Sequence, residues 1–144
     1  MSREILFKAK RINNGEWVER YIFKLKTTSK EYKVKDRYFI FTGEFDVTGL
    51  FPDFIRYEVD PSTICQCAGL TDKNNKKIWE NDIVKTYEAS SKEYLTNIVK
   101  YYKGSFKVFK KHYLSMYISK YELKDLEVIG NVFDNPELLE GGVL

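Results

Sequence analysis

Short runs of strand-forming residues, separated by turn signals, recur along almost the whole chain. Turns are indicated at residues 13–15, where Asn13 and Asn14 precede Gly15, at residues 72–76 and at Gly104, because Asn and Gly tolerate the positive φ of tight hairpins. Strands spaced about 8–12 residues apart in this way are typical of a β barrel or sandwich. The predicted strands cover residues 5–12, 17–26, 37–42, 55–59, 82–88, 94–103, 105–111 and 126–133, with a further strand ending at residue 70.

Two places are predicted to form short helical turns. Asp60 followed by Pro61 is a helix-start signal, because Asp accepts hydrogen bonds from the first free N–H groups and proline fits the first helical position. Asp134 or Asn135 can begin a second turn near the C-terminus, which opens with Pro136. The other segments are predicted as a polar loop over residues 27–36, irregular structure over 43–54, and a short helix or an irregular strand over 113–120.

The expected fold is mainly β, a β-rich α+β chain built as a small antiparallel barrel or sandwich. A chain of 144 residues, of which 43% are hydrophobic, can bury one core or two small lobes. The boundary is expected near Asp60. It separates an N-terminal β-rich region, residues 1–59, from a C-terminal region, residues 60–144, whose strand spacing suggests an SH3-like barrel. Alternatively, the two regions form one compact unit.

The charge balance argues against a strongly basic protein. The formal net charge is only +3, so any affinity for nucleic acid must come from a local cluster. The first seven residues form no long apolar run, and no window approaches the roughly 18 apolar residues of a membrane helix. We therefore expect a cytoplasmic protein without a membrane partner.

The residue types that carry catalysis are sparse. Cys65 and Cys67 flank Gln66, so in a strand they point the same way, but a zinc site needs about four ligands. The single histidine, His112, lies among lysines that disfavour its charged form. We expect no catalytic residues, no metal and no cofactor, and hence a protein that is not an enzyme. A metal shared between copies through the cysteines, or one held by carboxylates, is the alternative.

One segment favours nucleic acid. Residues 94–121 contain no Asp or Glu, while lysines and aromatic residues alternate. Basic side chains beside aromatic platforms are how small barrels hold single strands. Phe109 is expected to be exposed between two lysines; the alternative is a solvated hairpin whose Phe109 is covered by residues 113–120. The candidate nucleic-acid residues are Lys100, Lys103, Lys107, Phe109, Lys110 and Lys111.

A second segment favours a protein interface. Residues 43–54 contain the breakers Gly49 and Pro52, yet five apolar side chains lie among them. Such residues in a loop either plug a core or form an exposed patch that binds a partner or a second copy. The candidate interface residues are Phe45, Val47, Leu50, Phe51 and Phe54.

Three pieces of the chain, in this order and at this spacing, resemble the YopX family of phage and prophage proteins. They are Val59 to Thr63 followed by Gly69-Leu70, then residues 72–84, and finally residues 126–139. The chain departs from the usual family pattern at Cys65 and Cys67, and at Asn81, where glycine is common. The resemblance implies a phage or prophage origin, expression in the bacterial cytoplasm and a homo-oligomer. It implies no catalytic residues and no settled activity.

These observations predict a non-enzymatic, phage-encoded binding protein that self-associates and contacts a phage or host protein. The alternative is a weak nucleic-acid-binding module that uses the hairpin of residues 94–121.

Overall fold

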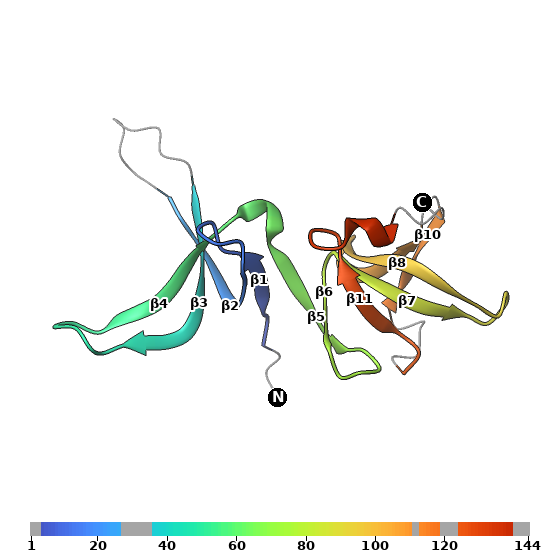
Figure 1. The fold of residues 1–144 in the computed structure, drawn as a ribbon, viewed down its shortest axis with the longest axis horizontal. Helices are drawn as coiled ribbons and strands as arrows, with labels where there is room; N and C mark the ends of the chain where they lie inside the picture. Colours follow the sequence, from blue (N-terminus) through green and yellow to red (C-terminus); the bar gives the residue numbers. More distant parts are fainter. Residues whose placement is uncertain (1–3, 27–35, 111–112, 119–123, 140–144) are drawn as a thin grey trace. The chain divides into compact units, whose positions relative to one another are not determined.

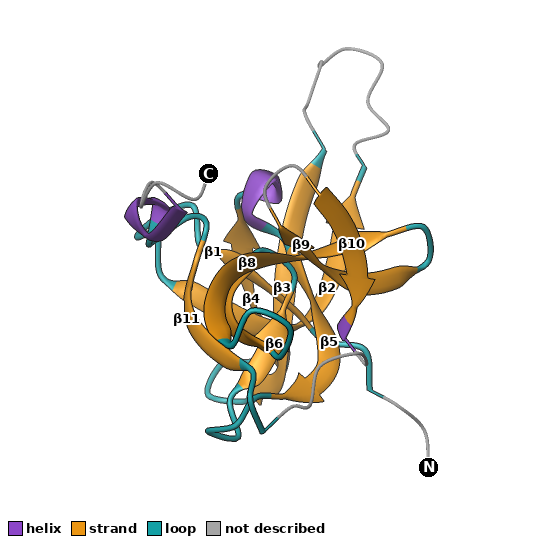
Figure 2. Ribbon diagram, turned by 90° about the vertical axis from the view of Figure 1, so that its right-hand side faces the viewer, coloured by secondary structure: helices purple, strands orange, loops and turns teal. Residues whose placement is uncertain are grey.

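The computed structural model describes residues 4–26, 36–110, 113–118 and 124–139. The described part is mostly strand (Figure 2). Its strands are β1 (Phe7–Lys10), β2 (Trp17–Leu25), β3 (Arg37–Asp46), β4 (Asp53–Val59), β5 (Cys65–Thr71), β6 (Lys77–Trp79), β7 (Asp82–Glu88), β8 (Glu93–Tyr102), β9 (Ser105–Lys110), β10 (Tyr113–Tyr117) and β11 (Glu127–Asn131). Two 3₁₀ turns, η1 (Pro61–Thr63) and η3 (Pro136–Leu139), confirm the predicted helical turns.

All the strand pairs are antiparallel, which confirms the mainly β prediction. The chain divides into two units, Met1–Gln66 and Cys67–Leu144, whereas the sequence placed the boundary after Val59. The first unit has the strand order β4-β3-β2-β1, with the first residues of β5 beside β1. In the second unit the rest of β5 pairs with β6, and five strands form a sheet in the order β10-β9-β8-β7-β11. Among the described strands neither sheet closes into a barrel.

Each unit has its own apolar core. In the first unit Ala9, Ile40 and Val59 are fully buried, and Val18, Tyr38 and Ile64 pack against them. Its sheet curls enough for Arg11 to form an isolated bridge with Val59 on the outermost strand, β4. The core of the second unit consists of Ala68, Ile78, Val84, Val99, Val108, Ile118, Leu126 and Val128.

The turns hold the conformations that their residue types favour. Lys103 and Gly104 both have positive φ, 49° and 83°, in the two-residue loop between β8 and β9. Asn81 has a φ of 69°, a conformation that Asn and Gly tolerate best. This explains why Asn can stand where the YopX-like pattern has glycine.

The buried Asp72 ties the β5–β6 turn to β11. One carboxylate oxygen, Oδ1, accepts the N–H groups of Asn74 and Lys76, each at 2.9 Å, and the other, Oδ2, accepts that of Val128 at 2.8 Å. Burial alone would raise the pKa of Asp72, but these three hydrogen bonds hold it below its usual value.

Gly130 lies where the pairing of β11 with β7 shifts register. A Cβ atom at this position would approach Asn135 Oδ1 to 2.5 Å. Glycine at this position therefore permits both the bulge and the close approach of Asn135.

The prediction of irregular structure over residues 43–54 holds for residues 47–52 but is wrong for residues 43–46 and 53–54, which are strand. β3 continues to Asp46 and β4 begins at Asp53, so the two strands form a long hairpin (Figure 1). Phe45 pairs with Phe54 beyond a register shift near Gly43, whose φ is 87°. The extra residues at this bulge interrupt the period-two pattern, which hid the strand in the sequence. Of the predicted segment 113–120, Tyr113–Tyr117 is a strand that pairs irregularly with β9, which confirms the strand alternative there; residues 119 and 120 lie outside the described residues.

Candidate interaction surfaces

The five predicted interface residues lie at and beside the end of the β3–β4 hairpin. The connecting segment is held by Thr48, whose Oγ1 and N–H both donate to Asp46 Oδ1, at 2.6 and 2.9 Å. These two bonds hold the pKa of Asp46 below its usual value. The side chains beside them are exposed, from 39% for Phe54 to 92% for Leu50. We call this set the apolar tip: Phe45, Val47, Leu50, Phe51 and Phe54.

The tip continues into a sheet face that the sequence did not reveal. Register places Tyr21 opposite Phe41, Phe23 opposite Phe39, and Phe45 opposite Phe54. Neighbouring ring centroids lie 5.3–6.4 Å apart, most of them tilted or edge-to-face. We call this set the aromatic face; its members are Tyr21, Phe23, Phe39, Phe41, Phe45 and Phe54.

Arginines flank the aromatic face. The guanidinium carbons of Arg20, Arg37 and Arg56 lie 5.6, 5.0 and 4.9 Å from the ring centres of Tyr21, Phe39 and Phe54. Arg37 also binds both carboxylate oxygens of Glu58 at 2.9 Å, which lowers the pKa of Glu58. Arg56 donates to Asp53 at 3.2 Å. The face therefore combines aromatic rings with cations, two of which, Arg37 and Arg56, already hold acidic partners.

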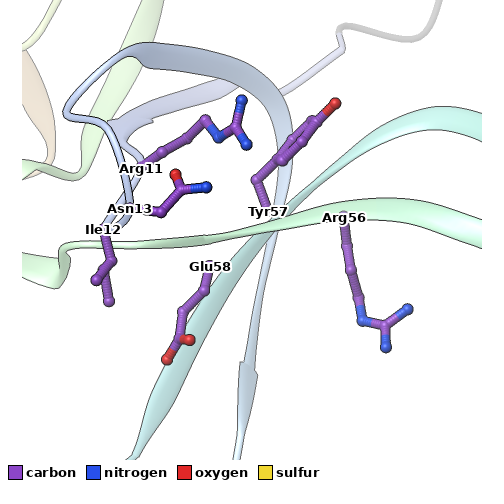
Figure 3. Close-up of a pocket in the computed structure, with 6 residues that line it drawn as sticks. All are labelled: Arg11, Ile12, Asn13, Arg56, Tyr57 and Glu58. Atoms are coloured by element: carbon purple, nitrogen blue, oxygen red, sulfur yellow. The ribbon is translucent and has the colours of Figure 1, made fainter.

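A shallow pocket of about 350 Å³ lies at the edge of β4. Arg11, Ile12 and Asn13 line one part of it, and Arg56, Tyr57 and Glu58 the other. The Arg11 guanidinium lies 4.1 Å from the ring centre of Tyr57, while Arg56 and Glu58 point to the other side of the strand (Figure 3). Because these polar groups do not converge, the pocket does not resemble a catalytic site.

The second unit carries a different surface, on one face of β7, β8 and β9. Val84, Asn97, Val99 and Val108 alternate inward and are buried, so the residues between them face the other way. We call this set the lysine–aromatic face: Lys85, Tyr87, Tyr94, Thr96, Ile98, Lys100, Tyr102, Lys107 and Phe109, with Lys103 in the adjoining turn.

The structure changes the expectation for two of the candidate nucleic-acid residues. Lys107 is only 9% exposed, and its Nζ atom lies 5.4 Å from the ring centre of Tyr102. Phe109 is half-buried and meets the same ring edge-to-face at 5.8 Å. Lys100 and Lys103 are exposed, as expected. The side chain of Lys110 and the whole of Lys111 lie outside the described residues.

The cysteines are packing residues in this structure. Both are buried free thiols, and Cys65 Sγ lies 3.3 Å from the carbonyl oxygen of Thr63. Within the described ranges, no group of three or more His, Cys, Asp or Glu side chains could hold a metal ion. His112 falls outside these ranges. In the part of the chain that the structure describes, no helix has both the length and the apolar character needed to cross a membrane.

Comparison with known proteins places the chain in a family. No curated protein matches it. Among solved structures, the crystal structure of protein EF1440 from Enterococcus faecalis is similar, with 25% sequence identity and a TM-score of 0.58. The match covers 96% of this chain and 99% of that one, so the similarity extends over both units. The family model described as YopX protein matches residues 2–140, and the chain therefore belongs to the YopX family.

Proposed function

We propose that this chain is a phage-encoded interaction protein without catalytic activity, which self-associates through the apolar tip and the adjoining aromatic face. The observation that carries the proposal is the exposure of all five tip residues on an ordered hairpin. Contiguous apolar side chains of this kind mark interaction sites, because leaving them in water is costly.

A second copy of the chain suits this surface by size. Three of the tip residues are phenylalanines, 63%, 78% and 39% exposed. At about 200 Å² per ring they offer roughly 350 Å² to a partner. A stable interface takes about 800 Å² from each side. The three rings alone are too small, but together with Val47, Leu50 and the aromatic face they approach that area.

The chemistry of the aromatic face is also self-complementary. In a two-fold interface the same surface meets itself, so the exposed rings, such as Phe45 and Phe54, can meet a guanidinium of the other copy. Arg37 and Arg56 already hold Glu58 and Asp53, which reduces repulsion between the copies. β4 is the last strand in the order of its sheet, and the part of its outer edge beyond the bridge between Arg11 and Val59 can pair with another chain, as outer strands readily do.

The test is the mass of the purified chain as a function of concentration, by size-exclusion chromatography with light scattering. The expected result is a species at a multiple of the 17.1 kDa chain mass that dissociates on dilution. A 17.1 kDa species at every concentration would contradict self-association and leave the tip for a phage or host protein. Assembly should also protect Phe51 from surface labelling, so that the ring is labelled in the monomer and not in the assembled form.

A further inference from the structure

The lysine–aromatic face of the second unit combines two features on three adjacent strands. Its rings form two separate pairs. Tyr87 and Tyr94 lie 5.2 Å apart towards one end of the strands, and Tyr102 and Phe109 lie 5.8 Å apart towards the other. Along β8, Tyr94 and Tyr102 are separated by roughly 26 Å of strand. The face therefore offers two aromatic platforms along one track.

Lysines accompany both platforms. Lys85 Nζ lies 5.0 Å from the ring centre of Tyr94, and Lys103 Nζ lies 5.3 Å from that of Tyr102. Lys100 lies between the platforms and donates to Asn81 Oδ1. Register also puts Lys100 directly opposite Lys107, so positive charges of two adjacent strands lie side by side on this face.

Acidic side chains are absent from β7, β8 and β9 on this face, and Glu127 lies beside it on the neighbouring strand β11. Glu88 and Glu93 are cross-strand neighbours, and their side chains lie on the opposite face of the sheet because they continue the inward alternation of Thr86 and Leu95. Glu127 lies opposite Lys85 on β11, and its carboxylate is paired with Lys73 at 3.1 Å. The result is a positive strip along β8.

We propose that the lysine–aromatic face binds single-stranded nucleic acid, with bases stacked on Tyr94 and Tyr102 and phosphates beside Lys85, Lys100 and Lys103. Stacking requires accessible rings, and both tyrosines are about half exposed. The flexible lysine stems that now lie near the rings can move to the phosphates, because exposed cation–π contacts are weak compared with base stacking. The largely buried Lys107 orients the Tyr102 ring.

The experiment is fluorescence anisotropy of the full chain with a labelled oligothymidine and a labelled oligouridine, at several salt concentrations. Three lysine–phosphate contacts predict a slope of log affinity against log salt of about −2. Replacing Tyr94 or Tyr102 by Ala should weaken binding about fivefold to 100-fold, as expected for loss of one stacked base. Affinities for the two oligonucleotides distinguish DNA from RNA as the preferred strand.

The charge contribution is tested with a matched pair of double variants. Lys100→Gln with Lys103→Asn removes two charges from the face, and Asn tolerates the positive φ at position 103. Lys26→Gln with Lys76→Gln removes two exposed lysines that are not members of the face. The first variant should reduce the salt slope by about 1.4, and the second should leave it unchanged.

Three results would overturn the proposal. One is no detectable binding of either oligonucleotide at low salt. Another is an equal loss of affinity in the two double variants, which would mean that only net charge matters. The third is that a duplex or a polyglutamate peptide binds as tightly as the single strand. Neither presents free bases, so equal affinity would exclude stacking on the tyrosines.

Discussion

Replacing Phe51 by Asp is expected to separate self-association from folding. The Phe51 side chain is 78% exposed within the chain. Of about 200 Å² of ring surface, roughly 160 Å² is therefore available to a partner and roughly 40 Å² is buried internally. At about 25 cal/mol per Å², the ring contributes about 4 kcal/mol per copy to assembly and about 1 kcal/mol to folding.

The effect on assembly is large because a two-fold interface contains Phe51 twice. The gross loss is about 8 kcal/mol per dimer, of which ordering costs and incomplete burial remove a part. If half of this gross loss appears in the binding free energy, the dimer is destabilised by about 4 kcal/mol, and its dissociation constant rises about 1000-fold. The added carboxylates increase the effect, because two buried negative charges repel each other.

The assay is sedimentation velocity over a series of protein concentrations, with urea unfolding of each variant in parallel. Ile5→Asp is the matched control, since Ile5 is 56% exposed and is not part of the apolar tip. The control should assemble like the unmodified chain. Phe51→Asp should stay monomeric at concentrations where the control is assembled, with a free energy of unfolding lower by only about 1 kcal/mol.

Two outcomes would refute the reasoning. If Phe51→Asp assembles at the same concentrations as the control, the tip is not the interface. If the variant loses several kcal/mol of stability as a monomer, the Phe51 ring is packed against its own chain and supports the fold.

Three further substitutions, one of them with a matched control, test the local chemistry of the fold by urea unfolding. Asp72→Asn should cost about 1–3 kcal/mol, because an amide cannot accept the Val128 N–H while keeping the turn bonds. Because the pKa of Asp72 is lowered in the folded state, its stabilisation is present above about pH 3.9 and is lost as the pH falls through the folded-state pKa. The difference in free energy of unfolding between the variant and the unmodified chain should therefore disappear in acid. Gly130→Ala should cost about 1–3 kcal/mol through the clash with Asn135, whereas Gly49→Ala, whose added Cβ meets nothing nearer than 3.7 Å, should be nearly neutral; equal effects would contradict the close approach. Lys103→Asn should leave stability unchanged or raise it by up to about 0.5 kcal/mol, and a clear loss would argue against the positive φ at that position.

Much of the fold could be predicted because the conformation of a hairpin turn depends mainly on the residues of the turn itself. The loop at Lys103-Gly104 and the 3₁₀ turn after Asp60 need only their own residues, and both were predicted. The end of β3 was missed because a bulge near Gly43 breaks the alternation on which strand prediction depends. Local patterns fail where the backbone leaves the regular period.

The candidate surfaces were predictable only in part, for a related reason. The apolar tip is contiguous in the chain, so its residues could be named from the sequence. On the aromatic face, the ring of Phe23 on β2 contacts that of Phe54 on β4. On the other surface, Tyr94 lies beside Tyr87 only because of the register between β7 and β8. Lys107 alternates outward as predicted, yet its side chain is buried, with its Nζ atom beside the Tyr102 ring. Contacts between strands depend on register, which the sequence alone does not fix.

The two surfaces differ in a way that makes the two proposals independent. On the aromatic face, Arg37 and Arg56 are paired with carboxylates, so the face is nearly balanced in charge and suits a copy of itself. On the lysine–aromatic face, the members on β7, β8 and β9 include no acid, which suits a polyanion. Phe51→Asp should therefore abolish assembly while the salt dependence of oligonucleotide binding remains. Lys100→Gln with Lys103→Asn should do the reverse. A single variant that removes both properties would show that one surface serves both, and would contradict this division.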